Sequence, residues 1–359
     1  MKNRNRIFLG AFIAASLFIT SCSNDDDTPA GVEITGDFAN GMFILNEGNF
    51  GANNASVSFL DSDGTLANNI FQSVNGENLG DTAQSMLLQD DKAYIVLNVS
   101  NTIQAVNRYT FESLGTVSTG LSNPRYMVIE NGKGYVSNWG DPTNPDDDYV
   151  AVINLSNYSV ESTIHVAEGP DRMKEEAGKI YVAHSGGYNY GNTVSVINTS
   201  NNSVATTVSV GDVPNSLFIE NGKLFVLCGG KASWTGDETL GKLVVINSTD
   251  NSVISSFDFP ATQHPSQLTG ADGKLYYTID NHIYSAGTNL TSLPTSELFS
   301  TGGQGVYGIY GFAVKNGKIY VGDAVDYTSN GQVYVYNLNG SLENSFEAGL
   351  LPNGFYFND

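Results

Sequence analysis

The chain alternates apolar and polar residues in short segments, which are separated by tight polar turns. A typical unit, RYMVIENGKGYVSN at 125–138, has an Asn-Gly pair between two alternating segments. Alternation with a period of two predicts β-strands, and Asn-Gly between two strands predicts a tight hairpin. Similar phrases follow later in the chain: AGKIYVAHSG, NGKLFVLCGG, DGKLYYTIDN and NGKIYVGDAV. The sequence therefore predicts one hairpin that is repeated along the chain.

An aromatic residue in the strand of each unit gives the length of the repeat. It stands at Phe43, Tyr94, Tyr135, Tyr181, Phe225, Tyr276 and Tyr320, with spacings of 41 to 51 residues. Units of this length suit the four-stranded blades of a β-propeller. Helical repeats are excluded because the apolar pattern has a period of two.

Each unit has the same order of parts. A short strand leads into the hairpin, and a loop of variable length follows the second strand. The third strand ends in Ile-Asn in YVAVIN, TVSVIN and KLVVIN, and a polar turn then leads to a fourth strand. Proline cannot donate a hydrogen bond within a sheet, so Pro124, Pro170, Pro214 and Pro265 mark the start of the first strand.

The two ends of the repeat region complete each other. The C-terminal LPNGFYFND resembles the first strand VPNSLFIEN, whereas GMFILNEG near the start reads as a second strand without a first. We therefore predict an all-β, seven-bladed β-propeller over residues 41–359, with four antiparallel strands per blade. The ring is closed by pairing of the N- and C-terminal strands.

The N-terminus reads as an export signal. Lys2, Arg4 and Arg6 precede an apolar run at 7–19, which is shorter than the 20 or so residues of a membrane span. Small residues before Cys22 resemble the lipobox of bacterial lipoproteins, which implies a signal peptide at 1–21 and lipidation of Cys22. We read residues 22–40 as a flexible acidic tether. A signal peptide with a chance cysteine stays as the alternative.

The net charge excludes one class of function, and the cysteine content excludes a disulfide within the mature chain. The chain has 37 acidic and 16 basic residues, a net charge of −21, which becomes −24 without the three basic residues of the leader. Nucleic-acid binding needs a basic surface and is excluded. With Cys22 lipidated, Cys228 has no disulfide partner within the chain, and we predict it to be a small buried residue.

Several segments carry a resemblance to a known family. YVSN at 135–138 is close to the YVTN-type propeller signature. Residues 42–61, 79–86, 122–127 and 320–340 resemble Bacteroidota surface lipoproteins of the YncE-like or surface-layer type. That family is similar to lipoproteins that capture vitamin B12 and pass it to a TonB-dependent transporter. The resemblance implies a propeller on the outer membrane that binds a cobalamin-like ligand. Asp25–Asp27 resembles a surface-export signal, and a tether facing the periplasm is the alternative.

The loops between second and third strands share a face with the connections between blades. They vary in length and are rich in aromatic and amide residues, as binding loops often are. From them and the blade entrances we predict these ligand-binding residues: Asn46, Phe50, Arg125, Trp139, Tyr149, Arg172, His184, Tyr188, Tyr190, Trp234, Asp323 and Tyr327.

A second set of residues follows the start of each blade and should gather around the top of the central channel. It consists of Gln84, Arg125, Asp171, Arg172, Asn215, Gln267, Tyr310 and Asn353. Arg125 and Arg172 are candidates for an anionic group of a ligand, because arginine donates two parallel hydrogen bonds to phosphate or carboxylate. Pairing with neighbouring acidic residues is an equal alternative in so acidic a chain.

Signals for catalysis are weak. No Ser/His/Asp order and no zinc-ligand spacing stands out, so we predict no catalytic residue, metal site or cofactor. We expect a monomeric, non-catalytic, lipid-anchored binding protein that faces the cell exterior. One alternative is a protein-interaction propeller in a surface complex. Another is a lactonase- or lyase-like propeller enzyme that uses channel carboxylates such as Glu47 and Asp171.

Overall fold

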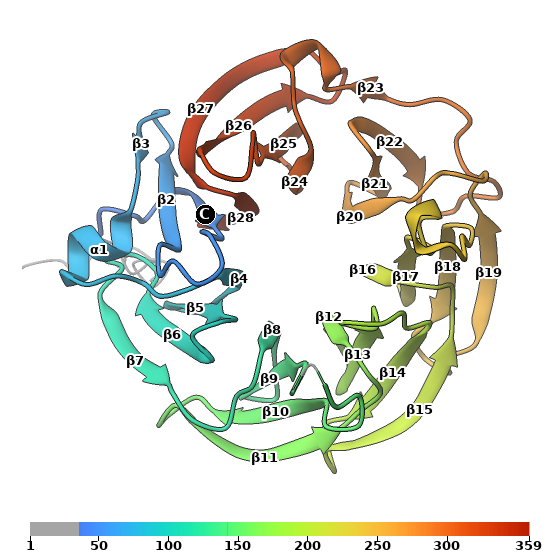
Figure 1. Cartoon of the computed structure of the whole chain (residues 1–359), viewed down its shortest axis with the longest axis horizontal. Helices are drawn as coiled ribbons and strands as arrows, with labels where there is room; N and C mark the ends of the chain where they lie inside the picture. The colour runs from blue at the N-terminus through green and yellow to red at the C-terminus, as the bar shows by residue number, and fades with distance from the viewer. Residues whose placement is uncertain (1–35, 142, 359) are drawn as a thin grey trace, which may run out of the picture. The chain divides into compact units, whose positions relative to one another are not determined.

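The computed structural model of the protein describes residues 36–141 and 143–358. In this part of the chain, 28 strands form seven four-stranded antiparallel sheets, which are the blades of a ring (Figure 1). Blade one contains β28, β1, β2 and β3 in that order, and blades two to seven contain β4–β7 through β24–β27. The predicted seven-bladed β-propeller is confirmed.

The strands take equivalent places in the seven blades. The inner strands are β4 (Ala83–Gln89), β8 (Pro124–Glu130), β12 (Pro170–Glu176), β16 (Pro214–Glu220), β20 (Ser266–Ala271), β24 (Ile309–Lys315) and β28 (Pro352–Asn358). The second strands are β1 (Gly41–Asn46), β5 (Lys92–Leu97), β9 (Lys133–Asn138), β13 (Lys179–His184), β17 (Lys223–Cys228), β21 (Lys274–Ile279) and β25 (Lys318–Asp323).

Two further strands complete each blade. The third strands are β2 (Ser56–Asp61), β6 (Thr102–Asn107), β10 (Tyr149–Asn154), β14 (Thr193–Asn198), β18 (Lys242–Asn247), β22 (His282–Gly287) and β26 (Asn330–Asn337). The outer strands are β3 (Leu66–Ala67), β7 (Ser113–Val117), β11 (Ser159–His165), β15 (Ser203–Ser209), β19 (Val253–Asp258), β23 (Phe299–Ser300) and β27 (Leu342–Leu350). Short helices are α1 (Ile70–Asn75), η1 (Ser233–Thr235) and η2 (Gly302–Gln304).

Local chemistry explains the repeated phrases. Asn131 and Gly132 both have positive φ, 51° and 74°, as the tight hairpin turn between β8 and β9 requires. The Asn that ends a third strand folds the next turn: Asn154 Oδ1 accepts the backbone N–H of Ser156 at 2.9 Å. Asn198 and Asn247 do the same in blades four and five. These side chains replace the sheet hydrogen bonds that the backbone loses at the turn.

Burial decreases from the middle strands outward. The second and third strands are apolar on both faces because each blade packs between two others. Seven clusters of buried residues result, one at each blade–blade interface of the described chain. Phe43 of blade one, for example, packs in the same cluster as Ile95 of blade two. The outer strand β15, by contrast, is almost wholly exposed and is rich in Ser and Thr.

The ends of the ring meet in blade one. β28 pairs antiparallel with β1, so that Ile44 lies opposite Phe355 and Met42 opposite Phe357. Phe355 then packs with Ile44 and with Val333 of blade seven. The predicted closure by N- and C-terminal strands is confirmed: the first and last strands of the propeller are neighbours in one sheet.

The packed chain begins a few residues before β1. Phe38 is buried and makes edge contacts with Phe59 and Phe111, with ring centroids 5.2 and 5.8 Å apart. Residues 36–40, predicted as the end of the tether, thus contact the propeller. The predicted signal peptide and Cys22 lie outside the described residues. None of the helices in the described segments has the length and apolar character to cross a membrane.

Substitution of Phe355 tests the closure. Phe355→Ala should lower the free energy of unfolding by about 3–5 kcal/mol, since it leaves a cavity between blades one and seven. Phe50→Ala is the matched control, because Phe50 is 84% exposed and should change stability by about 0.5 kcal/mol or less. Urea denaturation measures both, and equal stability of the two variants would contradict the closure.

Candidate ligand-binding site

One face of the propeller has all of the exposed aromatic side chains in the described chain. Five lie in loops between second and third strands, and Tyr307 lies in the connection into β24 next to them. They are Phe50, Tyr188, Tyr190, Trp234, Tyr307 and Tyr327. We call this face, with the channel opening at its centre, the mouth. The opposite face has the short Asn-Gly hairpins.

A β-bulge near the start of each inner strand supplies the residues around the opening. Pairing with the second strand shifts register in all seven blades, and the shift leaves one or two unpaired residues. A bulge bends its strand and redirects the side chain. The bulge residues are Gln84, Arg125, Tyr126, Asp171, Arg172, Asn215, Gln267, Leu268, Tyr310 and Asn353.

The bulges surround a polar pocket of about 240 Å³ at the mouth. It continues into a channel of about 510 Å³ along the inner strands. Six residues of the set predicted around the channel line the pocket, together with Glu47, Tyr126 and Tyr356: Gln84, Arg125, Arg172, Gln267, Tyr310 and Asn353. The structure therefore brings these six residues, which come from six different blades, together around one pocket.

Arg125 is held at the pocket edge by two neighbours. Its Nε lies 3.3 Å from Asp171 Oδ1, and its guanidinium lies 3.9 Å from the ring centroid of Trp139. The Trp139 ring meets the exposed Tyr188 edge-on at 5.7 Å. The buried Trp139 Nε1–H has no hydrogen-bond acceptor. Arg125, Trp139 and Tyr188 thus form a continuous surface from the pocket out to the loop of blade four.

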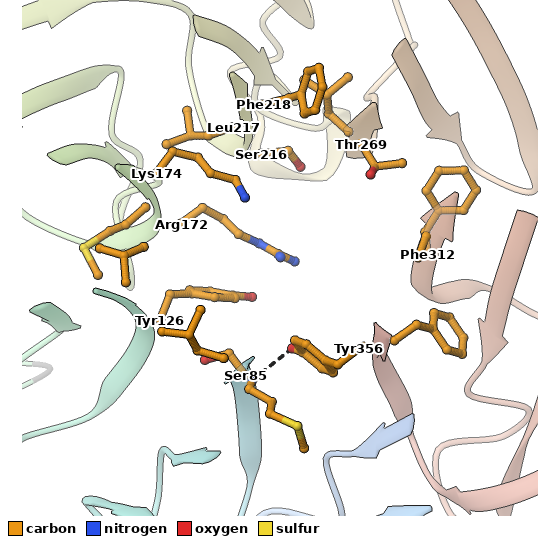
Figure 2. A pocket seen from close by; sticks show the side chains of 18 of the residues that line it. Ser85, Tyr126, Arg172, Lys174, Ser216, Leu217, Phe218, Thr269, Phe312 and Tyr356 are labelled. Carbon is orange, nitrogen blue, oxygen red and sulfur yellow. Dashed lines mark hydrogen bonds between the residues drawn. The ribbon is translucent and has the colours of Figure 1, made fainter. Parts of the chain in front are cut away.

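Arg172 differs from Arg125 in its partners. Its guanidinium lies 4.4 Å from the ring centroid of Tyr126. Among the described residues, no carboxylate lies within 4.0 Å of it, because the nearby Asp171 pairs with Arg125. Figure 2 shows Arg172 extending over Tyr126 into the open channel. Arg125 therefore pairs with an acid, whereas Arg172 has Tyr126 as its neighbour and no acidic partner within 4.0 Å in the described chain.

Glu47 faces the arginines across the pocket. Tyr310 Oη donates to Glu47 Oε2 at 2.6 Å, and Asn353 Nδ2 lies 3.4 Å from the same oxygen. Burial raises the pKa of Glu47, although the Tyr310 hydrogen bond and the charge of Arg125 oppose this. The Tyr310 ring contacts Tyr327, which contacts Tyr307. A second aromatic surface therefore extends from the pocket over blade seven.

Three predicted site residues are buried beneath the mouth. Asn46 Nδ2 donates to Ser58 at 2.9 Å, and Asp323 Oδ1 accepts the backbone N–H groups of Tyr307 and Val325. His184 is 1% exposed, and its Nε2 lies 2.8 Å from Ser195 Oγ. Burial lowers the pKa of His184 to about 4, so the ring is neutral at pH 7. Each residue supports a strand or a loop in the structure.

The other predicted residues lie farther from the pocket lining. Tyr149 is half-buried and donates from Oη to Gly120 O at 3.1 Å. Phe50, Tyr190 and Trp234 are exposed on the loops of blades one, four and five. They form an outer rim, whereas Arg125, Arg172 and Tyr310 line the centre.

Three residues of the site were missed in the sequence. Tyr126 and Tyr356 line the pocket, and Tyr307 belongs to the aromatic surface of blade seven. The place of Tyr126 directly after Arg125 was a usable signal, because a bulge can include two consecutive residues. The described residues include no group of three or more His, Cys, Asp and Glu side chains that could hold a metal ion. Cys228 is buried as predicted, and burial raises its pKa to about 12.

Fold and site together define a seven-bladed β-propeller with an aromatic and polar mouth. Residues 40–234 match the family DUF5074, a domain of unknown function, and the chain belongs to that family. A comparison with curated proteins finds no match.

Solved structures share the fold at low sequence identity. A quinonprotein alcohol dehydrogenase-like protein from Bacteroides thetaiotaomicron is 14% identical, with a TM-score of 0.65 and coverage of 90% of this chain and 79% of that one. A functionally unknown protein from Desulfotomaculum acetoxidans is 12% identical, with a TM-score of 0.65 and coverage of 89% and 98%. BamB from Moraxella catarrhalis is 14% identical, with a TM-score of 0.53 and coverage of 88% and 84%. These likenesses support the fold alone.

The buried neutral His184 predicts a pH dependence of stability. Between its ordinary pKa of 6.5 and about 4, the unfolded chain binds a proton that the folded chain excludes, so acidification destabilises the fold. His184→Gln removes this effect and keeps a polar partner for Ser195. From pH 7 to 4, wild type should lose about 3 kcal/mol more stability than the variant.

Urea denaturation across this pH range measures the difference. His165→Gln is the control, because His165 is exposed on the outer strand β11. If the free energies of unfolding of wild type and His184→Gln fall by the same amount from pH 7 to 4, the claim that the buried His184 is neutral is wrong.

Proposed function

We propose that this protein is a non-catalytic, lipid-anchored binding protein of the outer-membrane surface, which captures a large ligand at the mouth. The observation that carries the proposal is the concentration of exposed aromatic side chains on one face, around a polar pocket lined by two arginines. Aromatic residues are enriched at protein binding surfaces, and tyrosine and tryptophan combine a large contact area with a polar group.

The size of the site supports a ligand that spans several blades. An aromatic side chain buries about 150–250 Å² when it is fully covered. At about 25 cal/mol per Å², three or four half-covered rings contribute roughly 6–12 kcal/mol before the cost of association. A small metabolite would contact too few of these rings, since they belong to blades one, four, five and seven.

Within this class we favour a cobalamin-like ligand that is passed to a TonB-dependent transporter. The support is the sequence resemblance to B12-capturing surface lipoproteins, together with a mouth that combines flat aromatic surfaces and amide donors such as Gln84 and Gln267. Cys22 and the acidic segment after it support anchoring at the surface. We propose no reaction for the channel carboxylates: Glu47 is bound by Tyr310 and Asp171 by Arg125.

Gel filtration with cyanocobalamin tests this role. The purified protein at micromolar concentration should elute with visible cobalamin absorbance across the protein peak. Trp139→Ala and Tyr327→Ala should each weaken binding about tenfold, since each removes a ring of the mouth. Ile254→Ala on the outer strand β19 is the control and should bind as wild type does.

A colourless protein peak would remove cobalamin from the account. Docking of a partner protein would then be the better explanation of the mouth, with the outer rim as its contact. Phe50 and Trp234 favour that second candidate, because they are 84% and 82% exposed, the highest fractions among the exposed aromatic side chains of the described chain.

A further inference from the structure

Two positively charged side chains of one strand share the central channel. Arg172 and Lys174 are two residues apart on β12, and the bulge at Asp171 and Arg172 lies directly before Met173. Both line the channel, and Figure 2 shows both pointing into its open space. Lys174 keeps solvent-accessible surface although it lies inside the ring of inner strands.

Neither side chain has an acidic partner within 4.0 Å among the described residues, and Glu175 is the carboxylate that lines the same channel. Acidic residues outnumber basic ones by 37 to 16, so unpaired neighbouring cations are unexpected here. Burial in the channel lowers the pKa of Lys174; Glu175 opposes this, and the charge of Arg172 adds to it. The two cations therefore repel each other in a partly desolvated channel, and a bound anion would relieve the repulsion.

Two tyrosine hydroxyls complete the arrangement. Tyr126 Oη accepts from Gln84 Nε2 at 3.2 Å, and Tyr356 Oη accepts the backbone N–H of Met86 at 2.9 Å. Each hydroxyl keeps its own hydrogen for a further acceptor. Both rings line the pocket and the channel beside Arg172, so guanidinium, ammonium and hydroxyl donors converge on one space (Figure 2).

We propose that the channel below the mouth binds the phosphate group of a ligand, held by Arg172 and Lys174 and by the hydroxyls of Tyr126 and Tyr356. A phosphate monoester has a charge of about −1.5 to −2 and three acceptor oxygens, which matches two cations and several donors. A carboxylate has a single negative charge and only two acceptor oxygens. This inference rests on the proposed function, in which the mouth binds a ligand. It specifies the chemical group that this ligand places in the channel.

Calorimetric titration of the purified full chain with inorganic phosphate, phenyl phosphate and acetate at constant ionic strength tests the proposal. Phosphate should bind at least tenfold more tightly than acetate, and phenyl phosphate at least as tightly as phosphate. Arg172→Met and Lys174→Met should each weaken phosphate binding by about tenfold or more, because each removes a charged donor. Lys133→Met is the control: it removes one charge from an exposed ion pair with Glu161.

Three results would overturn the proposal. The first is that the wild-type protein does not bind phosphate at about 10 mM. The second is that acetate binds as tightly as phosphate. The third is that Arg172→Met and Lys174→Met keep wild-type affinity for phosphate while thermal denaturation shows that both variants are folded. If inorganic phosphate binds but phenyl phosphate does not, the site takes the free ion, and the claim that it binds the phosphate group of a larger ligand is wrong. Cyanocobalamin binding is measured separately, so failure of the phosphate site and failure of the proposed function can be told apart.

Discussion

The pairing of β28 with β1 is the contact on which the site depends. It inserts the last strand of the chain as the inner strand of the first blade, and so it closes the ring of inner strands. Closure is what brings Asn353, near the C-terminus, beside Glu47, near the start of the propeller. Without it, the bulge residues of blades one and two would not share a pocket.

The bulges connect this closure to function. The backbone carbonyl at or before a bulge accepts a side-chain hydrogen bond from the preceding blade at several junctions. Ser85 donates to Arg125 O, Ser137 to Asp171 O, and Asn215 to Pro265 O. These contacts fix the bulges to one another, which holds the pocket donors in place before a ligand arrives. Preorganised donors bind an anion at a lower entropic cost than mobile ones.

The fold was predictable because it is encoded locally and repeated. Asn131-Gly132 and the Asn that ends five of the seven third strands define turns whatever the rest of the chain does. The site was predictable only in part. Repeat position placed Arg125, Arg172 and Tyr310 around the channel, because equivalent residues of a ring converge on its axis. The partners of the arginines were not predictable. Asp171 pairs with Arg125, whereas Arg172 lies over the ring of Tyr126, and this depends on side-chain directions that the spacing does not contain.

Burial was the other limit. His184 and Asp323 have the residue types of a binding site, and they lie at the ends of second strands that the mouth loops cover. The sequence of a strand end does not show whether a neighbouring loop covers it or leaves it exposed to solvent. Tyr307 was missed for the opposite reason, since it lies in a connection between blades that has no repeated phrase.

Both tryptophans of the protein, Trp139 and Trp234, lie at the mouth, so intrinsic fluorescence reports directly on the central claim that ligand binds there. Titration with cyanocobalamin should quench this fluorescence with saturation, after correction with free tryptophan for absorbed light. Trp139→Phe should remove most of the quenched signal, because Trp139 lies against the pocket residue Arg125. Binding detected by gel filtration with no saturable change in tryptophan fluorescence would contradict the account.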